Sequence, residues 1–224
     1  MVSGVFQFIA NNFPQALYLT GEHVWIVGVA LFIAAATGIP LGLYITEHED
    51  IASPIISGAN IIMTIPSIAL FGIMLPLLSP LNMGLGKIPA IIALILYSQL
   101  PIIRNTYTAI KNVPPDLVDA AIGVGMSRWQ RLKEVEIPLA APVIIAGLRT
   151  AAVMNIGIAA IAVYIGSGGL GVYIQQGIDR AYPEMILSGA LLVSILALIV
   201  DGIMALLERA ITPEGIKVRK KLMQ

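Results

Sequence analysis

The segment from Asp116 to Pro142, DLVDAAIGVGMSRWQRLKEVEIPLAAP, gathers ionisable side chains in a chain that is only 12% charged. It is the longest charged interval between two apolar blocks. Its charged residues are Asp116, Asp119, Arg128, Arg131, Lys133, Glu134 and Glu136. Because isolated charges are costly in apolar surroundings, we expect this segment to lie in water.

Two short helices joined by a turn are predicted within this segment. The prolines at 114–115 suit the first turn of a helix, where no amide donor is needed, and Asp116 places negative charge near its positive N-terminal end. A helix should therefore begin near residue 115. Gly123 weakens that helix at its end, and Ser127 with Gln130 three residues later has the form of a capping box that opens a second short helix.

Small and large side chains lie beside one another in the middle of the segment. Ala120, Ala121 and Gly125 allow another surface to approach the backbone closely, whereas Met126 and Trp129 suit anchoring in a pocket. The stretch is therefore typical of a knob for a partner protein. The alternative is an ordinary loop helix whose tryptophan rests at a membrane surface.

Composition indicates an integral membrane protein. Of 224 residues, 58% are hydrophobic, the mean hydropathy is +0.89, and uncharged runs exceed the roughly 20 residues needed to cross a bilayer. There is no cysteine, which excludes disulfides, thiolate nucleophiles and cysteine-ligated metal, and the histidines His23 and His48 stand far apart, so we expect no metal site. The net charge is zero, and no global field would recruit nucleic acid.

The elements that must position the charged segment are apolar spans. About five transmembrane helices are predicted in an all-α polytopic protein, near residues 25–46, 55–78, 88–110, 142–165 and 185–207. Pro66 and Pro76 should kink the second span. GSGGLG at 166–171 should end the fourth in a flexible turn, and residues 3–20 are expected to form an interfacial segment that Pro14 interrupts.

Orientation follows from the positive residues. Ten of the thirteen Lys and Arg residues surround the connection between the third and fourth spans or lie in the tail, whereas Lys87 and Arg180 lie on the opposite side. The positive-inside rule then predicts that the charged segment and the tail are cytoplasmic and that the N-terminus is outside. The first cytoplasmic loop, EHED, is acidic and gives no support to this orientation. The opening residues show no cleavable signal peptide.

The expected divisions are an external interfacial segment at 1–22, a transmembrane domain at 23–208 and a basic cytoplasmic tail at 209–224. We find no internal repeat and no GxxxxGK[ST] phosphate loop, so the chain should not hydrolyse ATP by that route.

Ionisable and polar side chains within the spans are the remaining candidates for function. Arg149 lies about ten residues into the fourth helical block, and Asp201 is a possible partner in the fifth. Either they form a structural ion pair or they belong to a translocation pathway. The same two alternatives apply to other polar or adaptable side chains at membrane depth, namely Gln99, Asn155, Tyr164, Ser98 and Met154.

The charged segment resembles the EAA loop of ABC importer permeases. The family pattern is Glu-Ala-Ala, three residues, Gly, nine residues and Ile-x-Leu-Pro, and the matching residues here are Asp119, Ala120, Ala121, Gly125, Val135, Ile137 and Pro138. Asp119 keeps the charge of the family's glutamate on a shorter side chain. The phrases TIPSIALFGIMLPLL, IGSGGLGVYI and TPEG resemble the permeases of glycine betaine, carnitine and choline importers, so the likeness covers about residues 20–216.

This resemblance implies a type I ABC importer permease fold, with a coupling loop at 112–138. It implies a non-catalytic subunit of the bacterial inner membrane that works in osmoprotection with a second permease, a cytoplasmic ATPase dimer that binds ATP-Mg, and an external solute-binding protein. Asp119, Ala120, Ala121, Gly125, Met126 and Trp129 would contact the ATPase. Quaternary ammonium solutes suit aromatic cages, and because aromatics are only 6% and scattered, we expect that cage in the binding protein.

Two other functions remain open from the residues. A type I permease for another polar solute, such as methionine, would share the EAA pattern. A self-sufficient channel or secondary transporter would leave the charged segment merely solvated, but five spans without an inverted repeat argue against it.

Overall fold

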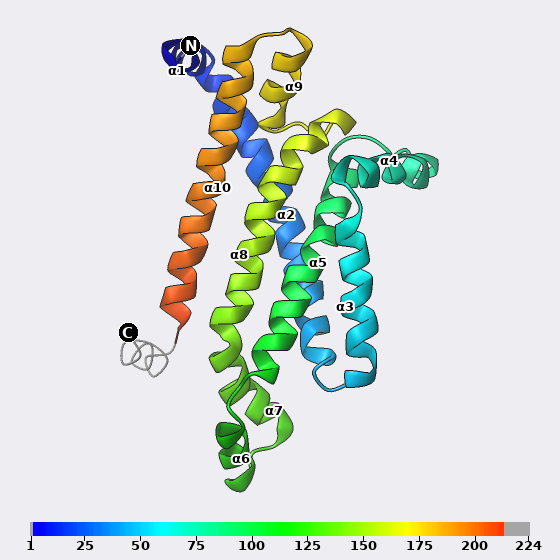
Figure 1. Ribbon diagram of the computed structural model, residues 1–224, viewed down its shortest axis with the longest axis vertical. Coiled ribbons are helices and arrows are strands. Elements are labelled where there is room, and N and C mark those ends of the chain that lie inside the picture. The colour runs from blue at the N-terminus through cyan, green and yellow to red at the C-terminus, as the bar shows by residue number, and fades with distance from the viewer. Residues whose placement is uncertain (1, 213–224) are drawn as a thin grey trace.

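Helices form every regular element of the structure, a computed structural model that describes residues 2–212 (Figure 1). In order these are α1 (Val2–Asn11), α2 (Phe13–Tyr44), α3 (Glu49–Thr64), α4 (Ser67–Leu78), η1 (Ser79–Leu81), α5 (Lys87–Lys111), α6 (Pro115–Gly123), α7 (Arg128–Arg131), the π-helical η2 (Leu132–Glu136), α8 (Ile137–Ile161), η3 (Ala162–Ile165), α9 (Gly171–Asp179) and α10 (Pro183–Ile211). The Lys-rich part of the predicted tail and its TPEG phrase lie largely outside the described residues.

The predicted spans correspond to long apolar helices. Within the described residues, α2, α5, α10 and the helical run at 128–165 are each long and apolar enough to cross a membrane. The pair α3 and α4 passes the same test only together, and it is bent by 99°. The expectation of about five spans is therefore met if this bent pair counts as one span.

Pro66 causes the bend between α3 and α4. The residue before a proline is pushed out of the helical region, and Ile65 is accordingly extended, with φ −71° and ψ 127°. The Tyr97 hydroxyl of α5 donates to the Ile65 carbonyl at 2.7 Å, which satisfies an acceptor freed by the break. Pro76 lies within α4 without breaking it. The predicted span at 55–78 is thus two helices rather than one kinked helix.

The N-terminal region is broken two residues before Pro14, the residue that was expected to interrupt it. Its two helices meet at Asn12, whose side chain donates to the Phe8 carbonyl at 2.8 Å. Pro14 follows in the first turn of α2, where a proline costs no hydrogen bond. The first long helix therefore begins at Phe13 rather than near Trp25, because Pro14 starts a helix instead of interrupting one.

Helix α5 packs on both α2 and α8, which also contact each other, and α10 packs on α8. Small residues make these contacts close: a Cβ at Gly42 would lie 2.6 Å from the Thr106 side chain, and one at Gly147 would lie 2.8 Å from the Pro101 carbonyl oxygen. Of the spanning glycines, Gly38, Gly42, Gly147 and Gly189 serve contacts inside this subunit, whereas Gly28 and Gly157 face open space.

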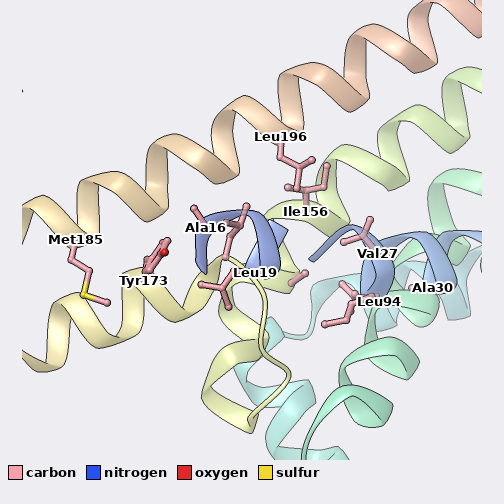
Figure 2. Close-up of a cluster of buried hydrophobic side chains, with 12 residues drawn as sticks. Ala16, Leu19, Val27, Ala30, Leu94, Ile156, Tyr173, Met185 and Leu196 are labelled. Atoms are coloured by element: carbon pink, nitrogen blue, oxygen red, sulfur yellow. The ribbon is translucent and has the colours of Figure 1, made fainter. Parts of the chain in front are cut away.

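The largest apolar cluster lies where the long helices meet α9. Figure 2 shows Leu19 of α2, Leu94 of α5, Ile156 of α8, Tyr173 of α9 and Met185 of α10 among its members. Residues from five separate elements thus enclose one core, which fixes the positions of the long helices relative to one another.

The two ends of the bundle differ in what they carry (Figure 1). One end holds α1 and α9, with α4 extending sideways from it, and we call it the α9 end. The other holds α6, α7 and the turn between α2 and α3, and we call it the α6 end. The charged segment therefore lies at the α6 end, and its last residues belong to α8.

Candidate functional site

The coupling loop at 112–138 forms the two predicted short helices. Helix α6 begins at Pro115, and it ends in a Schellman motif. In that motif the Met126 amide donates to the Ala121 carbonyl at 3.1 Å, and the Gly125 amide donates to the Ile122 carbonyl at 2.9 Å. Gly125 has φ +81°, which side-chain-bearing residues adopt only with strain. The glycine of the EAA pattern is therefore required by the backbone of this turn.

The second short helix opens with the predicted capping box. The Ser127 hydroxyl accepts from the Gln130 amide at 3.4 Å, and the Gln130 side chain accepts from the Ser127 amide at 2.9 Å. Helix α7 continues through π-helical η2 into α8, so residues 128–161 form one helical run. The turn at Gly125 is thus followed directly by a helical run that includes a spanning helix.

Large apolar side chains are exposed on α6, on α7 and on the turn between them. The exposed side chains are Leu117 at 44%, Ile122 at 52%, Trp129 at 69% and Val124 at 76% exposure. Exposed apolar groups at the centre of a polar segment are typical of protein contact sites. We call this set, with Met126, the apolar knob.

Of the five residues of the apolar knob, the sequence predicted two, Met126 and Trp129. Asp119, Ala120 and Gly125 are exposed and Met126 is half-buried, so these positions are accessible to a partner. Ala121 is only 5% exposed, because it lies on the buried side of α6. Leu117, Ile122 and Val124 were missed, although large apolar residues in a short charged segment were a signal that could have identified them.

Arg149 and Asp201 form an ion pair, as one of the two hypotheses for these residues predicted. The guanidinium of α8 donates twice to the carboxylate of α10, from Nε at 2.5 Å and from Nη2 at 2.7 Å, and Nη1 lies 3.5 Å from Glu208. This bidentate geometry is strong and directional. Both side chains are about one third exposed and open onto a groove of about 510 Å³ between α8 and α10. Thr150 and Met154 also line this groove.

The other polar candidates do not converge on this groove. Asn155 is buried and donates to Ser98 at 2.8 Å, while its side-chain oxygen has no hydrogen-bond partner among the described residues. Gln99 donates to Thr37 at 3.1 Å, and Tyr164 is exposed in η3 near the α9 end. The structure therefore separates the predicted pathway residues into four places, counting the groove beside Arg149 and Asp201. None of the described residues forms a group of three or more acidic or histidine side chains able to hold a metal.

Polar groups at the α9 end join three helices. The Glu22 carboxylate of α2 accepts hydrogen bonds from Lys87 Nζ of α5 at 2.7 Å and from the Gly169 amide at 3.3 Å. His23 lies between the Ile156 carbonyl, 3.0 Å from Nε2, and the Leu170 amide, which donates to Nδ1 at 3.3 Å. Since Nδ1 accepts, Nε2 carries the proton and donates. We call these six residues the outer network.

The outer network holds the glycine-rich loop in one conformation. Gly166, Gly168 and Gly169 all have φ near +80°, and a Cβ at Gly168 would lie 2.6 Å from the Glu22 carboxylate. The prediction of a turn at 166–171 is confirmed. The Gly169 and Leu170 amides donate to Glu22 and His23, which supplies the acceptors that buried amides require.

Aromatic side chains that are distant in sequence meet beside α9. Phe8 packs edge to face with Tyr173 at 5.4 Å and with Tyr182 at 5.7 Å between ring centroids. Burial raises the pKa of the Tyr173 phenol, which keeps it a neutral donor to the Asn12 carbonyl at 3.4 Å. These rings pack on one another, so they join α1 to α9.

Comparisons with known proteins agree on one family. The family model described as the binding-protein-dependent transport system inner membrane component matches residues 38–213. The osmoprotectant import permease protein OsmW of Salmonella typhimurium is 46% identical over 94% of this chain and 98% of that protein. The glycine betaine/carnitine/choline transport system permease protein OpuCB of Bacillus subtilis is 44% identical over 96% of this chain and 97% of that protein.

The fold also has a solved counterpart. A structure of the MetNI methionine ABC transporter in inward-facing conformations matches 92% of this chain and 98% of that chain, with a TM-score of 0.77 and 20% identity. At this identity the likeness supports the fold and carries no conclusion about the solute. The expected fold, a type I ABC importer permease, is confirmed.

Proposed function

The chain belongs to the inner membrane components of binding-protein-dependent transport systems, and we propose that it carries a quaternary ammonium osmolyte across the membrane as one permease of an ATP-driven importer. Glycine betaine, carnitine and choline are the proposed solutes, because they appear in the name of a relative that is 44% identical over nearly the whole chain. The reading as a methionine permease rests on a fold likeness at 20% identity and is the weaker one.

The apolar knob is the observation that supports coupling to a separate ATPase. Val124, in the turn after α6, and Trp129, in the first turn of the helical run that enters the bundle as α8, are both more than two thirds exposed. A surface of this kind loses apolar exposure when it enters a groove on a partner. We propose that a cytoplasmic ATPase dimer, which binds ATP-Mg, supplies this groove and that Asp119, Ala120, Ala121, Gly125, Met126 and Trp129 contact or position it. The permease itself then performs no catalysis.

We propose that the α6 end faces the cytoplasm and the α9 end faces outward. Lys111, Arg128, Arg131 and Lys133 lie at the α6 end, in agreement with the positive-inside rule. Because the chain has no cysteine, Val124→Cys provides a single thiol at a site that is 76% exposed. In cells that express the chain without the ATPase, an impermeant maleimide should label it in inverted vesicles and leave it unlabelled when the cells are intact. The opposite pattern would reverse the orientation.

The groove beside Arg149 and Asp201 is the proposed contact with a second permease. Charged groups that are one third exposed within the spans are costly against lipid, so this face requires protein or water. Thr150→Cys, on the groove, should cross-link to the second permease, whereas Ile199→Cys, 54% exposed and about 160° around α10 from Asp201, should not. Cross-linking of Ile199→Cys alone would move the interface. Expression with and without a related permease decides between a homodimer and a heterodimer.

Uptake of labelled glycine betaine at high osmolarity tests the proposed function. The host strain lacks its own osmolyte systems and expresses the chain with the neighbouring transporter genes. We expect saturable uptake that choline or carnitine blocks and methionine does not, together with an ATPase that copurifies with the chain. Block by methionine alone would discard the osmolyte assignment, and flux without any ATPase would discard the importer.

A further inference from the structure

The turn between α2 and α3 carries the acidic sequence EHED at the α6 end, where basic residues gather. Its carboxylates are paired with that basic group. Glu47 forms an ion pair with Arg128, the first residue of α7, and Glu49, in the first turn of α3, forms one with Lys111 at the end of α5. The acidic turn is thus joined to the coupling loop and to the helix that precedes it.

The two ion pairs differ in how they suit their own helices. Glu49 at a helix N-terminus and Lys111 at a helix C-terminus are both placed where the helix dipole favours them. Arg128 is placed against the dipole, because it is a cation in the first turn of the helical run at 128–161. The position of Arg128 is therefore explained by its contact with Glu47 rather than by helix stability.

Other contacts between the coupling loop and the bundle are sparse. Helices α6 and α7 pack chiefly on one another and on η2. A cavity of about 300 Å³ separates them from the ends of α2 and α5. The cavity is lined by Glu47, Asp119 and Glu136 together with Lys111, Arg128 and Arg131, so its three negative and three positive charges indicate a wet space.

We propose that the Glu47–Arg128 contact makes the α2–α3 turn a second receiver of the movement of the coupling loop, alongside the direct connection of α7 to α8. The proposal rests on the proposed function, because it requires that a partner ATPase displaces α6 and α7. Glu47 is then a positioning residue: it contacts neither ATPase nor solute, and it conveys displacement across a cavity that packing does not fill. Glu49 and Lys111 hold the turn to α5 beside it.

The displacement has a defined route beyond the turn. Helix α3 leads from the turn to the break at Pro66, where the Ile65 carbonyl is held by Tyr97 of α5. Leu70 and Phe71 of α4 are buried in one apolar cluster with Ala93 of α5. A shift of the turn therefore acts on a bent pair of helices whose far half is fastened to α5.

Charge reversal tests the contact in the assembled transporter. We expect Glu47→Arg and Arg128→Glu each to lower the solute transported per ATP hydrolysed about threefold, in keeping with the modest strength of exposed ion pairs. The double variant, Glu47→Arg with Arg128→Glu, should return this ratio to within about 1.5-fold of the wild type, because it restores an attractive pair.

Matched controls come from the same two segments. Lys133→Glu reverses a positive charge in an exposed position of the coupling loop, as Arg128→Glu does. Asp50→Arg reverses a negative charge in the same acidic sequence as Glu47, as Glu47→Arg does. Neither Lys133 nor Asp50 forms an ion pair within residues 2–212. Both should leave the ratio unchanged. A defect in Arg128→Glu that the double variant does not correct, with Glu47→Arg normal, would overturn the proposal, since Arg128 would then act on the ATPase directly.

Cross-linking distinguishes movement as one unit from movement of the loop past the turn. The chain has no cysteine, so Glu47→Cys with Arg128→Cys offers one pair of thiols for a short bismaleimide. If loop and turn move together, the cross-linked transporter should keep at least half of its uptake. Loss of uptake on cross-linking, with each single cysteine variant active after the same treatment, would contradict the proposal. Absence of uptake and of ATPase binding in the wild type would instead reject the proposed function.

Discussion

At the α9 end, the glycine-rich loop is tied to Glu22 and His23 by its own backbone amides, in a closely packed network. At the α6 end, the coupling loop meets the α2–α3 turn through an exposed ion pair across a cavity. Backbone bonds to buried groups permit few alternative geometries, whereas exposed ion pairs re-form readily after a shift. The contrast indicates that the α9 end maintains the arrangement of the helices and the α6 end accommodates movement.

The largest expected effect comes from adding one methyl group at the α9 end. A Cβ at Gly171 would lie 2.1 Å from the backbone oxygen of Ala160, so Gly171→Ala should destabilise the protein by about 3 kcal/mol and reduce the folded yield. At the α6 end nothing lies within 4 Å of the Cβ position of Gly125. Gly125→Ala should cost only about 1–2 kcal/mol of local backbone strain. Equal melting temperatures for the two variants in detergent would remove the contrast.

Bulk at the α6 end should act on transport instead. Gly125→Trp should reduce osmolyte uptake more than tenfold, because the side chain would occupy the surface of the apolar knob, and the melting temperature should stay close to that of Gly125→Ala. Uptake by Gly125→Ala separates backbone strain from bulk. Gly21→Trp, which adds the same side chain to open space on α2, is the control and should transport within about twofold of the wild type. Normal uptake by Gly125→Trp would contradict the assignment of the apolar knob as the contact with the ATPase.

Loss of one member of the outer network should lower global stability moderately. His23→Leu removes the acceptor of the Leu170 amide and leaves that donor buried, which costs about 2 kcal/mol. The measurement is the midpoint of thermal unfolding in detergent, with His48→Leu, an exposed histidine at the α6 end, as the control. Equal midpoints for the two variants would mean that the outer network contributes no rigidity.

The smallest effect is expected at the cap of α7. Ser127→Ala removes the side-chain acceptor of the Gln130 amide and should cost about 1 kcal/mol. Because the coupling loop opens locally, hydrogen exchange at residues 127–131 should accelerate about fivefold without a change in the melting temperature. Faster exchange throughout α8 would show instead that the coupling loop and the bundle unfold together.

Local chemistry determines much of the coupling loop. The start of α6 at Pro115, its end near Gly123 and the capping box of Ser127 with Gln130 each depend on residues within four positions of one another. The apolar spans are equally readable, since a run of about 20 uncharged residues has few alternatives to a membrane helix. Helix starts marked by proline were misread at Pro14, where a helix begins instead of being interrupted, and at Pro66, where a new helix begins instead of a kink.

Tertiary structure alone decided which distant groups meet. The pairing of Glu47 with Arg128, the contact of His23 with Leu170 and the burial of Asn155 against Ser98 depend on how the helices pack, which no local signal specifies. Arg149 and Asp201 are an intermediate case. The cost of charge within a span predicted that Arg149 needs a partner, and Asp201 was a candidate, but only the packing of α10 on α8 brought the two within 2.5 Å. Sequence thus determined the elements and their caps through short-range hydrogen bonds and hydropathy, whereas long-range packing determined the contacts that connect them.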